Sequence, residues 1–210
     1  MKEKELLRLQ NLKKIEEEIY SKNENIKYIC GIDEAGRGPL AGPVVVASVI
    51  MPHDSMIEGV NDSKKVSEKK REELYEKIIE ESISYGVGIM DHNEIDEYNI
   101  LNATKMGLTN SLKELTVKPD LIVVDALNKI DTLGIPYKSI IKGDALCYSI
   151  SAASIIAKVT RDRIMRQWDE VYPMYGFQKH KGYGTAAHIA AIKEYGLCPI
   201  HRKSFTKNFI

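Results

Sequence analysis

The sequence has few cysteines, no long apolar run and no net charge. Its three cysteines, Cys30, Cys147 and Cys198, are isolated and odd in number, which excludes a disulfide framework and a CxxC metal knuckle. The longest largely apolar run, 44–51, is far shorter than the roughly 18 residues that a membrane span needs. The N-terminus opens with charges, whereas a secretory signal has an apolar core. We therefore expect a cytoplasmic protein with no membrane partner.

The charges are balanced overall but unevenly placed. The 210 residues, 43% of them hydrophobic, are enough for one main domain. Residues 158–210 carry ten Lys and Arg against four Asp and Glu, whereas residues 25–157 carry fourteen against twenty. A basic segment beside an acidic one suits a polyanionic ligand and metal ions. Solvated surface charge explains the same pattern equally well.

Hydrophobic periodicity outlines the order of helices and strands. Apolar residues at spacings of three and four predict a helix over 5–20, within an N-terminal helical extension (1–25) that precedes the main domain (26–210). Further helices are predicted over 67–82, 94–115, 150–157 and 185–195, and strands over 28–33, 44–51, 83–90, 121–124 and 137–141. This order predicts an α/β fold: a mixed five-stranded sheet flanked by helices, with N-terminal and C-terminal helical additions.

Four acidic residues lie where predicted elements begin or end. Asp33 and Glu34 close the first strand, and Asp125 directly follows the all-apolar strand 121–124, at the edge where α/β sheets usually place ligands. Asp144 precedes the small-residue helix, near the positive end of its dipole. Taken singly, an exposed carboxylate is most simply a solvated charge. If the four converge, their repulsion requires hard divalent cations such as Mg²⁺ or Mn²⁺, which prefer oxygen ligands.

The glycine-rich loop 36–43 resembles a dinucleotide-binding fingerprint only at first sight. Its spacing is GxGxxxG, and a β-branched run follows it where the fingerprint requires a helix. What remains is an arginine bracketed by glycines, whose backbone can approach a phosphate or sugar closely. An ordinary hairpin loop is the equally good alternative.

Six sequence blocks occur in the order of a known family. They are IDEAGRGPLAGPVV (32–45), NDSKK (61–65), VVD (123–125), KGD (142–144), SAASIIAKVTRD (151–162) and HKGYGT (180–185). Over residues 28 to about 200, the chain closely resembles the ribonucleases HII. The N-terminal 25 residues fall outside this resemblance.

The resemblance implies an RNase H-like core and a metal site. The implied metal ligands are Asp33, Glu34, Asp125 and Asp144. The residues implied to contact 2′-hydroxyls around the cut are Gly36, Arg37 and Gly38, and Tyr183 is implied to pack on the sugar at the RNA-to-DNA junction. Many relatives have Gly where this chain has Ala126, which should narrow the backbone freedom there. Asp162 lies in a matching block too, and it is an alternative fourth acid if its helix turns toward the site.

The activity implied by the resemblance is that of a metal-dependent endonuclease. It hydrolyses the RNA strand of RNA/DNA hybrids and incises 5′ of ribonucleotides embedded in duplex DNA, using two Mg²⁺ or Mn²⁺ ions and leaving a 5′-phosphate and a 3′-hydroxyl. We expect a monomer whose partner is the nucleic acid. Another RNase H-like nuclease, such as a Holliday-junction resolvase or ribonuclease HIII, and a noncatalytic hybrid-binding protein are the alternatives.

Basic residues are candidates for contacts with the phosphates, and three histidines are candidates for a catalytic role. The lysine candidates are Lys64, Lys65, Lys158, Lys179 and Lys181, and Ser154 is a further candidate for substrate contact. Each lysine alone is more simply a solvated side chain, but as a group they predict salt-sensitive binding. The spread of His180, His188 and His201 favours surface or capping roles over catalysis.

Overall fold

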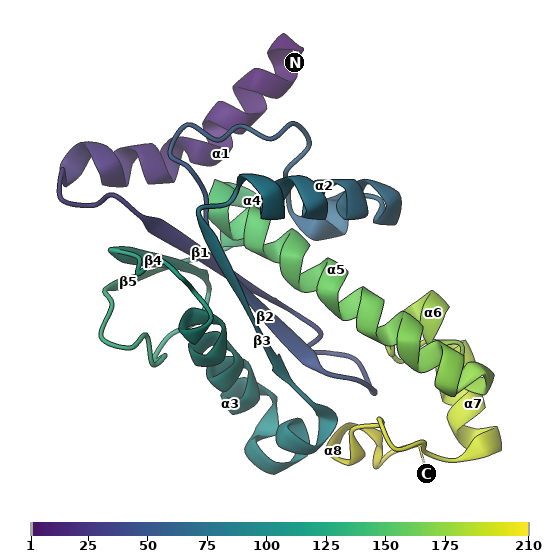
Figure 1. Ribbon diagram of the computed structural model, residues 1–210. Coiled ribbons are helices and arrows are strands. Elements are labelled where there is room, and N and C mark those ends of the chain that lie inside the picture. Colours follow the sequence, from purple (N-terminus) through teal and green to yellow (C-terminus); the bar gives the residue numbers. More distant parts are fainter. Residues whose placement is uncertain (1, 210) are drawn as a thin grey trace.

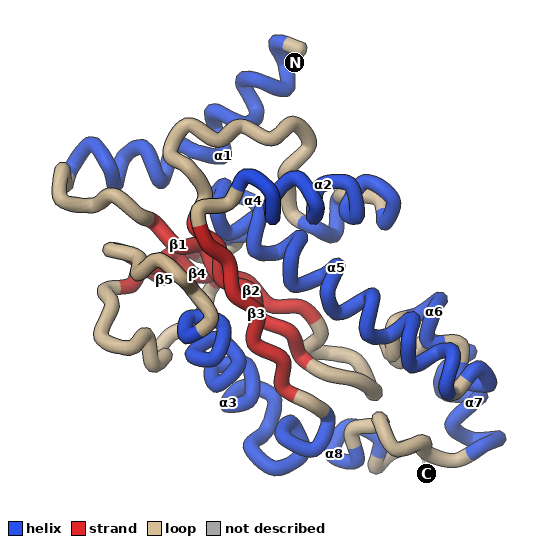
Figure 2. The backbone as a smooth tube through the Cα atoms, in the orientation of Figure 1, coloured by secondary structure: helices blue, strands red, loops and turns tan. Residues whose placement is uncertain are grey.

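The computed structural model describes residues 2–209, which form a five-stranded sheet with helices on both faces (Figure 1, Figure 2). The strands are β1 (Ile29–Ala35), β2 (Val44–Ile50), β3 (Ser84–Met90), β4 (Leu121–Asp125) and β5 (Tyr137–Ile140). Their order across the sheet is β3-β2-β1-β4-β5. Strands β1, β2 and β3 pair antiparallel, whereas β4 and β5 continue from β1 in parallel. The predicted α/β fold and its mixed five-stranded sheet are confirmed.

The helices flank the sheet and extend it at both ends of the chain. The longer ones are α1 (Glu3–Lys22), α2 (Glu68–Glu81), α3 (His92–Lys113), α5 (Tyr148–Val171) and α7 (Ala186–Tyr195). The short ones are η1 (Ser63–Lys65), α4 (Gly143–Leu146), η2 (Pro173–Tyr175), α6 (Phe177–His180) and α8 (Lys203–Thr206). Among residues 2–209, each helix is too short or too polar to cross a membrane.

Two helices differ from their predicted bounds. Helix α5 extends far beyond the predicted 150–157, because its small-residue start continues into a second, longer stretch of helix formers. Helix α3 begins earlier than predicted, because Asp91 accepts hydrogen bonds from the Asn93 and Glu94 amides while the Glu94 carboxylate accepts one from the Asp91 amide. It is kinked at Asn99, where φ is 63°.

Alternation along β2 separates two parts of the core. Val45, Ala47 and Val49 pack with side chains of α1, α2 and α5. Val46 and Ile50 point to the other face and pack with side chains of α3. The sheet is therefore buried on both faces, with α5 along one and α3 along the other, as Figure 1 also shows.

Helix α5 approaches β1 closely because both carry small residues. A Cβ at Gly31 would lie 2.2 Å from the carbonyl carbon of Ser149, and Ala152 and Ala153 are fully buried. Gly31 thus faces α5. Because side chains two apart in a strand share a face, Asp33 faces α5 as well.

Helix α1 packs on the main domain through both apolar and polar side chains. Leu9 and Leu12 belong to the core that includes α5. Lys13 and Glu16 are buried too: the Lys13 ammonium donates to the Ser55 carbonyl at 3.1 Å. The N-terminal helix is confirmed, whereas a domain boundary at residue 25 stays a prediction.

The C-terminal helices cover the loop 36–43 from outside the sheet. The Leu40 amide donates to the Gly182 carbonyl at 2.8 Å, and the Gly42 amide donates to the Ile200 carbonyl at 2.9 Å. Leu40 and its neighbours share a core cluster with side chains of α5, α6 and α7. The last quarter of the chain therefore holds this loop in place.

Candidate active site

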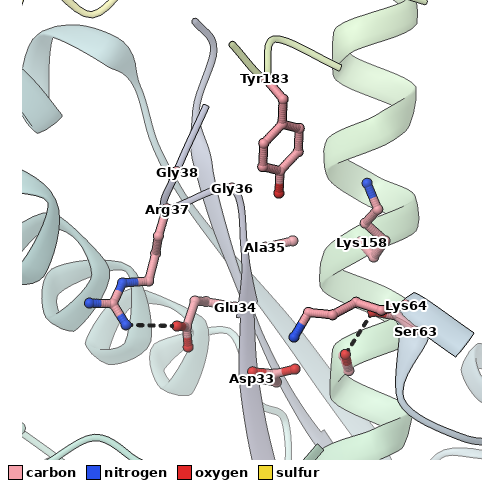
Figure 3. A pocket seen from close by; sticks show the side chains of 11 residues that line it. Asp33, Glu34, Ala35, Gly36, Arg37, Gly38, Ser63, Lys64, Lys158 and Tyr183 are labelled. Atoms are coloured by element: carbon pink, nitrogen blue, oxygen red, sulfur yellow. Dashed lines mark hydrogen bonds and ion pairs between the residues drawn. The ribbon is translucent and has the colours of Figure 1, made fainter. Parts of the chain in front are cut away.

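A pocket opens at the carboxyl end of β1, bordered by the loop after β1, η1 and α5 (Figure 3). Its lining residues are Asp33, Glu34, Ala35, Gly36, Arg37, Gly38, Ser63, Lys64, Ser154, Lys158 and Tyr183. Most of the residues that the sequence predicted for the site therefore share one pocket. The predicted site residues outside this lining are Asp125, Asp144, Lys65, Lys179 and Lys181.

The two adjacent acids of β1 meet the pocket from different sides of the strand. The strand stays extended through Ala35, so Asp33 faces α5 and Glu34 begins on the opposite face. Burial, and then the neighbouring charge of Glu34, raise the pKa of Asp33 well above its usual range. Burial also raises the pKa of Glu34, although Arg37, 3.3 Å from its carboxylate, opposes the shift. Figure 3 shows these two acids bordering the same space.

Asp125 ends β4, and the parallel pairing of β4 with β1 places it beside Asp33. Its carboxylate accepts a hydrogen bond from the Gly143 amide at 2.7 Å. Burial raises the pKa of Asp125; the Gly143 bond opposes this, and the charge of Asp144 adds to it. The next residue, Ala126, is held at φ 44°, in the left-handed region that favours glycine.

Asp144 lies in the short helix α4 and is 8% exposed. Its carboxylate pairs with the Lys64 ammonium at 3.2 Å. We expected it at the N-terminus of the small-residue helix, but Cys147 follows α4 before that helix begins. The carboxylate that accepts from the first turn of α5 is Glu16 of α1, 2.7 Å from the Ser149 amide. Asp144 does precede that helix, whose Ser151 hydroxyl donates to the Asp144 carbonyl at 2.7 Å; a contact of its carboxylate with the helix dipole stays a prediction.

A lysine lies among the acids. Burial alone would lower the pKa of Lys64, but Asp144 raises it above its ordinary value, and Asp33 contributes in the same direction. Among residues 2–209, no three His, Cys, Asp or Glu side chains converge into a ready-made metal site. The donor chemistry nevertheless fits a hard divalent cation, since the acids offer only carboxylate oxygens and their crowding raises pKa values that a cation would lower.

Asp162, the alternative fourth acid, is engaged elsewhere. It is buried on α5, where its carboxylate lies 2.7 Å from the Lys158 ammonium and 3.7 Å from the Arg71 guanidinium. It does not line the pocket, whereas Lys158 does. Lys65 points to Asp62 at 3.8 Å, outside the pocket lining.

The glycine loop and Tyr183 face each other across the pocket. A Cβ at Gly38 would lie 3.9 Å from the Tyr183 ring, and Tyr183 as a residue is 43% exposed. On the α5 side, the Ser154 hydroxyl is 2.9 Å from the hydroxyl of Ser63. Figure 3 places Tyr183 across from Gly36 and Ala35. A flat aromatic face and a closely approachable backbone thus border the same space as two carboxylates.

Two of the three histidines, His188 and His201, are buried, so a surface role is wrong for them; His180 is half-buried, and its Nδ1 atom accepts from the Gly182 amide at 3.2 Å, a capping type of contact. His188 and His201 are 0% and 2% exposed, and their Nε2 atoms lie 3.0 Å apart. The Nδ1 atom of His188 is 3.0 Å from the Tyr183 carbonyl. Because a carbonyl can only accept, Nδ1 of His188 carries the proton and its Nε2 accepts one from His201. Burial lowers the pKa of His188 to about 4.

The remaining lysine candidates differ in their surroundings. Lys181 is buried, and its ammonium donates to the Gln178 carbonyl and lies 3.4 Å from Glu68. Lys179 is exposed. The sequence reasoning missed Ser63, although it lies in one of the quoted blocks. It also gave no role to Arg161, in another quoted block, or to Arg202; both are fully buried beneath the glycine loop.

Comparison with known proteins gives one family. The family model for ribonuclease HII matches residues 30–208. The ribonuclease HII of Acetivibrio thermocellus is 58% identical over 99% of this chain and 80% of its own length. The crystal structure of ribonuclease H2 from Pyrococcus horikoshii OT3 is similar with a TM-score of 0.74 and 29% identity, over 87% of this chain and 96% of that one.

Two further solved structures carry partners or ions of their own. The RNase HII in the PCNA:RNase HII complex from Archaeoglobus fulgidus has a TM-score of 0.69 and 29% identity, over 83% of this chain and 93% of that one. Bst-RNase HIII in complex with Mn²⁺ has a TM-score of 0.60 and 21% identity, over 80% of this chain and 63% of that one, a likeness that shows the fold alone. The family model and the identities over nearly the whole chain settle the assignment. The chain belongs to the ribonuclease HII family, the metal-dependent endonucleases that cleave RNA in RNA/DNA hybrids and at ribonucleotides embedded in DNA.

Proposed function

We propose that this chain incises duplex DNA on the 5′ side of an embedded ribonucleotide and cuts the RNA strand of hybrids, leaving a 5′-phosphate and a 3′-hydroxyl. The observation that carries this proposal is the shared pocket: Asp33 and Glu34 border the same space as the glycine loop and Tyr183. Carboxylates suit phosphodiester hydrolysis with divalent cations. Backbone groups at close range suit the 2′-hydroxyl, which both donates and accepts hydrogen bonds and distinguishes RNA from DNA.

The proposed ligands of Mg²⁺ or Mn²⁺ are Asp33, Glu34, Asp125 and Asp144. When bound, such ions activate the attacking water and stabilise charge on the leaving oxygen. The chain's own part is to hold the carboxylates in place: Gly143 fixes Asp125 through its amide, and the β1–β4 pairing sets Asp125 beside Asp33. Lys64, which pairs with Asp144, neutralises part of the acidic cluster and offers its ammonium to a phosphate.

The proposed contacts with the substrate divide between sugar and phosphate. Backbone groups of Gly36, Arg37 and Gly38 read the 2′-hydroxyl, and the Tyr183 ring packs on the adjoining sugar. Residues proposed to contact phosphates are Lys64, Lys65, Ser154 and Lys158. Lys65 lies outside the pocket lining, so its phosphate lies further along the strand. We also place the catalytic domain at residues 26–210, with residues 1–25 as an extension packed on it, and expect a monomer.

A duplex with one embedded ribonucleotide tests the reaction. The labelled duplex is incubated with Mg²⁺, Mn²⁺ or chelator, and the cut position and end groups are read from the fragments. We expect incision 5′ of the ribonucleotide with either ion and none with chelator. Asp33→Asn should abolish cleavage, whereas Asp54→Asn, in an exposed loop, should cleave as wild type. Absence of cleavage by the wild type with both ions would overturn the proposal.

The fourth acid needs its own comparison. Asp144→Asn should remove cleavage and weaken Mn²⁺ binding measured by calorimetry. Asp162→Asn should lower stability, because it leaves Lys158 without its 2.7 Å partner, but keep Mn²⁺ binding. The reverse pattern of Mn²⁺ affinities would assign the metal ligand to Asp162.

A further inference from the structure

Two fully buried arginines lie behind the glycine loop. Arg161 of α5 is 1% exposed, and Arg202, just before α8, is 0% exposed. A buried guanidinium normally pairs with a carboxylate. Here, every hydrogen bond of the two groups within residues 2–209 ends on a backbone carbonyl. The two arginines therefore act as hydrogen-bond donors to backbone carbonyls.

The carbonyls in question belong mostly to the loop 36–43. Arg202 donates to the carbonyls of Gly36 at 2.6 Å, Arg37 at 3.0 Å and Gly42 at 2.9 Å. Both arginines donate to the Pro43 carbonyl, at 2.9 Å from Arg161 and 3.1 Å from Arg202. Carbonyls at both ends of the loop are thus turned inward, away from the pocket. The Arg37 and Gly38 amides have no acceptor within residues 2–209.

Arg161 also reaches the turn that carries Tyr183. It donates to the Lys181 carbonyl at 2.9 Å, and its guanidinium carbon lies 5.7 Å from the centre of the Tyr183 ring. It packs so closely behind the loop that a Cβ at Gly36 would lie 2.1 Å from its Nε atom. One guanidinium therefore fixes both walls of the pocket relative to each other.

We infer that Arg161 and Arg202 are positioning residues for ribonucleotide recognition. They hold the loop carbonyls inward, which leaves the Arg37 and Gly38 amides free to face the 2′-hydroxyl, and Arg161 sets the distance of Tyr183 from that loop. A guanidinium suits this task because its rigid fork carries five donors, whereas an ammonium carries three on a flexible stem. The inference rests on the proposed reading of the 2′-hydroxyl by this loop.

The two positive charges have a second consequence. Burial lowers the pKa of Arg202 to about 9 and that of Arg161 to about 10, so both stay protonated at neutral pH. Charges that are shielded from water act over a longer range than surface charges. The pair therefore favours a polyanion in the pocket whether its sugar is ribose or deoxyribose. Positioning and attraction can be separated by a substitution that keeps the charge and loses the fork.

Arg161→Lys and Arg202→Lys make this separation. KM is measured for a duplex with one ribonucleotide, and the inhibition constant Ki is measured for the matched all-DNA duplex, both with Mg²⁺. Neither constant depends on how much of the enzyme is folded, so a merely destabilising substitution leaves the ratio Ki/KM unchanged. We expect the ratio to fall by about tenfold in each variant, as hydrogen bonds to one sugar hydroxyl are lost, while Ki changes little.

Matched variants keep the test decisive. Arg163→Lys on the same helix, whose guanidinium pairs with Glu72 and Glu76 at the surface, should leave the ratio as in wild type. If a lysine variant fails to fold, Arg161→Met and Arg202→Met replace it, because they remove the buried charge and keep most of the volume; there the ratio should fall and Ki should rise.

The outcomes separate the two proposals. A wild-type ratio of one would mean that the enzyme does not read the 2′-hydroxyl, and the proposed function of the loop would fail. If Ki/KM is above one in the wild type and equally high in every folded Arg161 and Arg202 variant, the function of the loop stands and the positioning role is overturned.

Discussion

The N-terminal helix α1 should stabilise the catalytic core through one buried carboxylate. Glu16 is 6% exposed, and one of its oxygens accepts a hydrogen bond from the Ser149 amide at 2.7 Å, in the first turn of α5. The same oxygen lies 3.0 Å from the Cys147 sulfur. A negative charge in this place satisfies an amide that the helix itself leaves unpaired and opposes the positive end of its dipole.

The size of the effect follows from these contacts. A hydrogen bond to a charged group contributes about 1.5–3 kcal/mol, and a charge at a partly buried helix end adds up to about 2 kcal/mol. Glu16→Ala should therefore lower the free energy of unfolding by roughly 3 kcal/mol, which corresponds to a melting temperature lower by about 6–12 °C in a chain of this size. Glu16→Gln keeps an acceptor oxygen and loses the charge, so about half the effect is expected.

Thermal unfolding by circular dichroism in chelator-containing buffer measures this loss. The matched control is Glu18→Ala on the same helix. The Glu18 side chain is 58% exposed, and its carboxylate forms a surface ion pair with Lys22 at 3.8 Å. A surface pair of this kind contributes about 0–1 kcal/mol. If Glu16→Ala melted within about 2 °C of the control, or if the glutamine variant were the less stable of the two Glu16 variants, the account of the buried charge would be refuted. At temperatures where each variant is folded, cleavage should equal that of wild type.

Three other predictions concern backbone strain, pH and the acidic cluster. Ala126→Gly should stabilise the protein by about 1 kcal/mol, because alanine at φ 44° is strained, and calorimetry should show the gain as a melting temperature higher by about 2–4 °C. Burial lowers the pKa of His188 to about 4 from an ordinary 6.5, so its stabilisation is complete above pH 6.5 and is lost as the pH falls toward 4. Urea unfolding across that range should show that the free energy of unfolding falls by up to about 3 kcal/mol, and by less where solvent screens the imidazolium charge. The variant His188→Gln should lack this pH dependence. In metal-free buffer, Asp33→Asn should raise the melting temperature, because the raised pKa of Asp33 means that its charge opposes folding. Added Mn²⁺ should then stabilise the wild type more than the variant.

Much of the fold could be predicted because each strand has a clear local signal. Residues 44–50 are mostly apolar and β-branched, and 121–124 is an all-apolar run, which is typical of a strand buried on both faces. Helix α1 was predicted from its apolar stripe, but its attachment was not. Lys13 and Glu16 lie on the same face as the stripe, four residues after Leu9 and Leu12, but the buried partners of two charged side chains cannot be read from that position. Their burial depends on Ser55 and on the start of α5, which no local pattern reveals.

Some residues of the site could likewise be predicted from the sequence, and others could not. Asp33 and Asp125 could be found because an acid that ends an apolar strand must emerge at the edge of the sheet, and the strand pairing places the two side by side. The partners of the other acids could not be found. Asp144 meets Lys64, 80 residues away, and Asp162 is occupied by Arg71 from α2. Pairings of this kind depend on how helices pack on the sheet, and charged residues on helices look alike in a sequence.

The buried arginines illustrate a more general limit. A loop that approaches a substrate closely has irregular backbone, and any of its carbonyls that are turned away from the substrate need donors inside the protein. Regular strands and helices supply such donors from their own backbone, but an irregular loop needs side chains. Arg161 and Arg202 reach this loop from 118 and 166 residues further along the chain, measured to Pro43 and Gly36. Sequence patterns assign arginine to the surface, so the exposed half of the loop was predicted and the half that supports it was not. Arg161 should therefore be tested first as the support of this loop, because it donates both to the Pro43 carbonyl and to the Lys181 carbonyl in the turn before Tyr183.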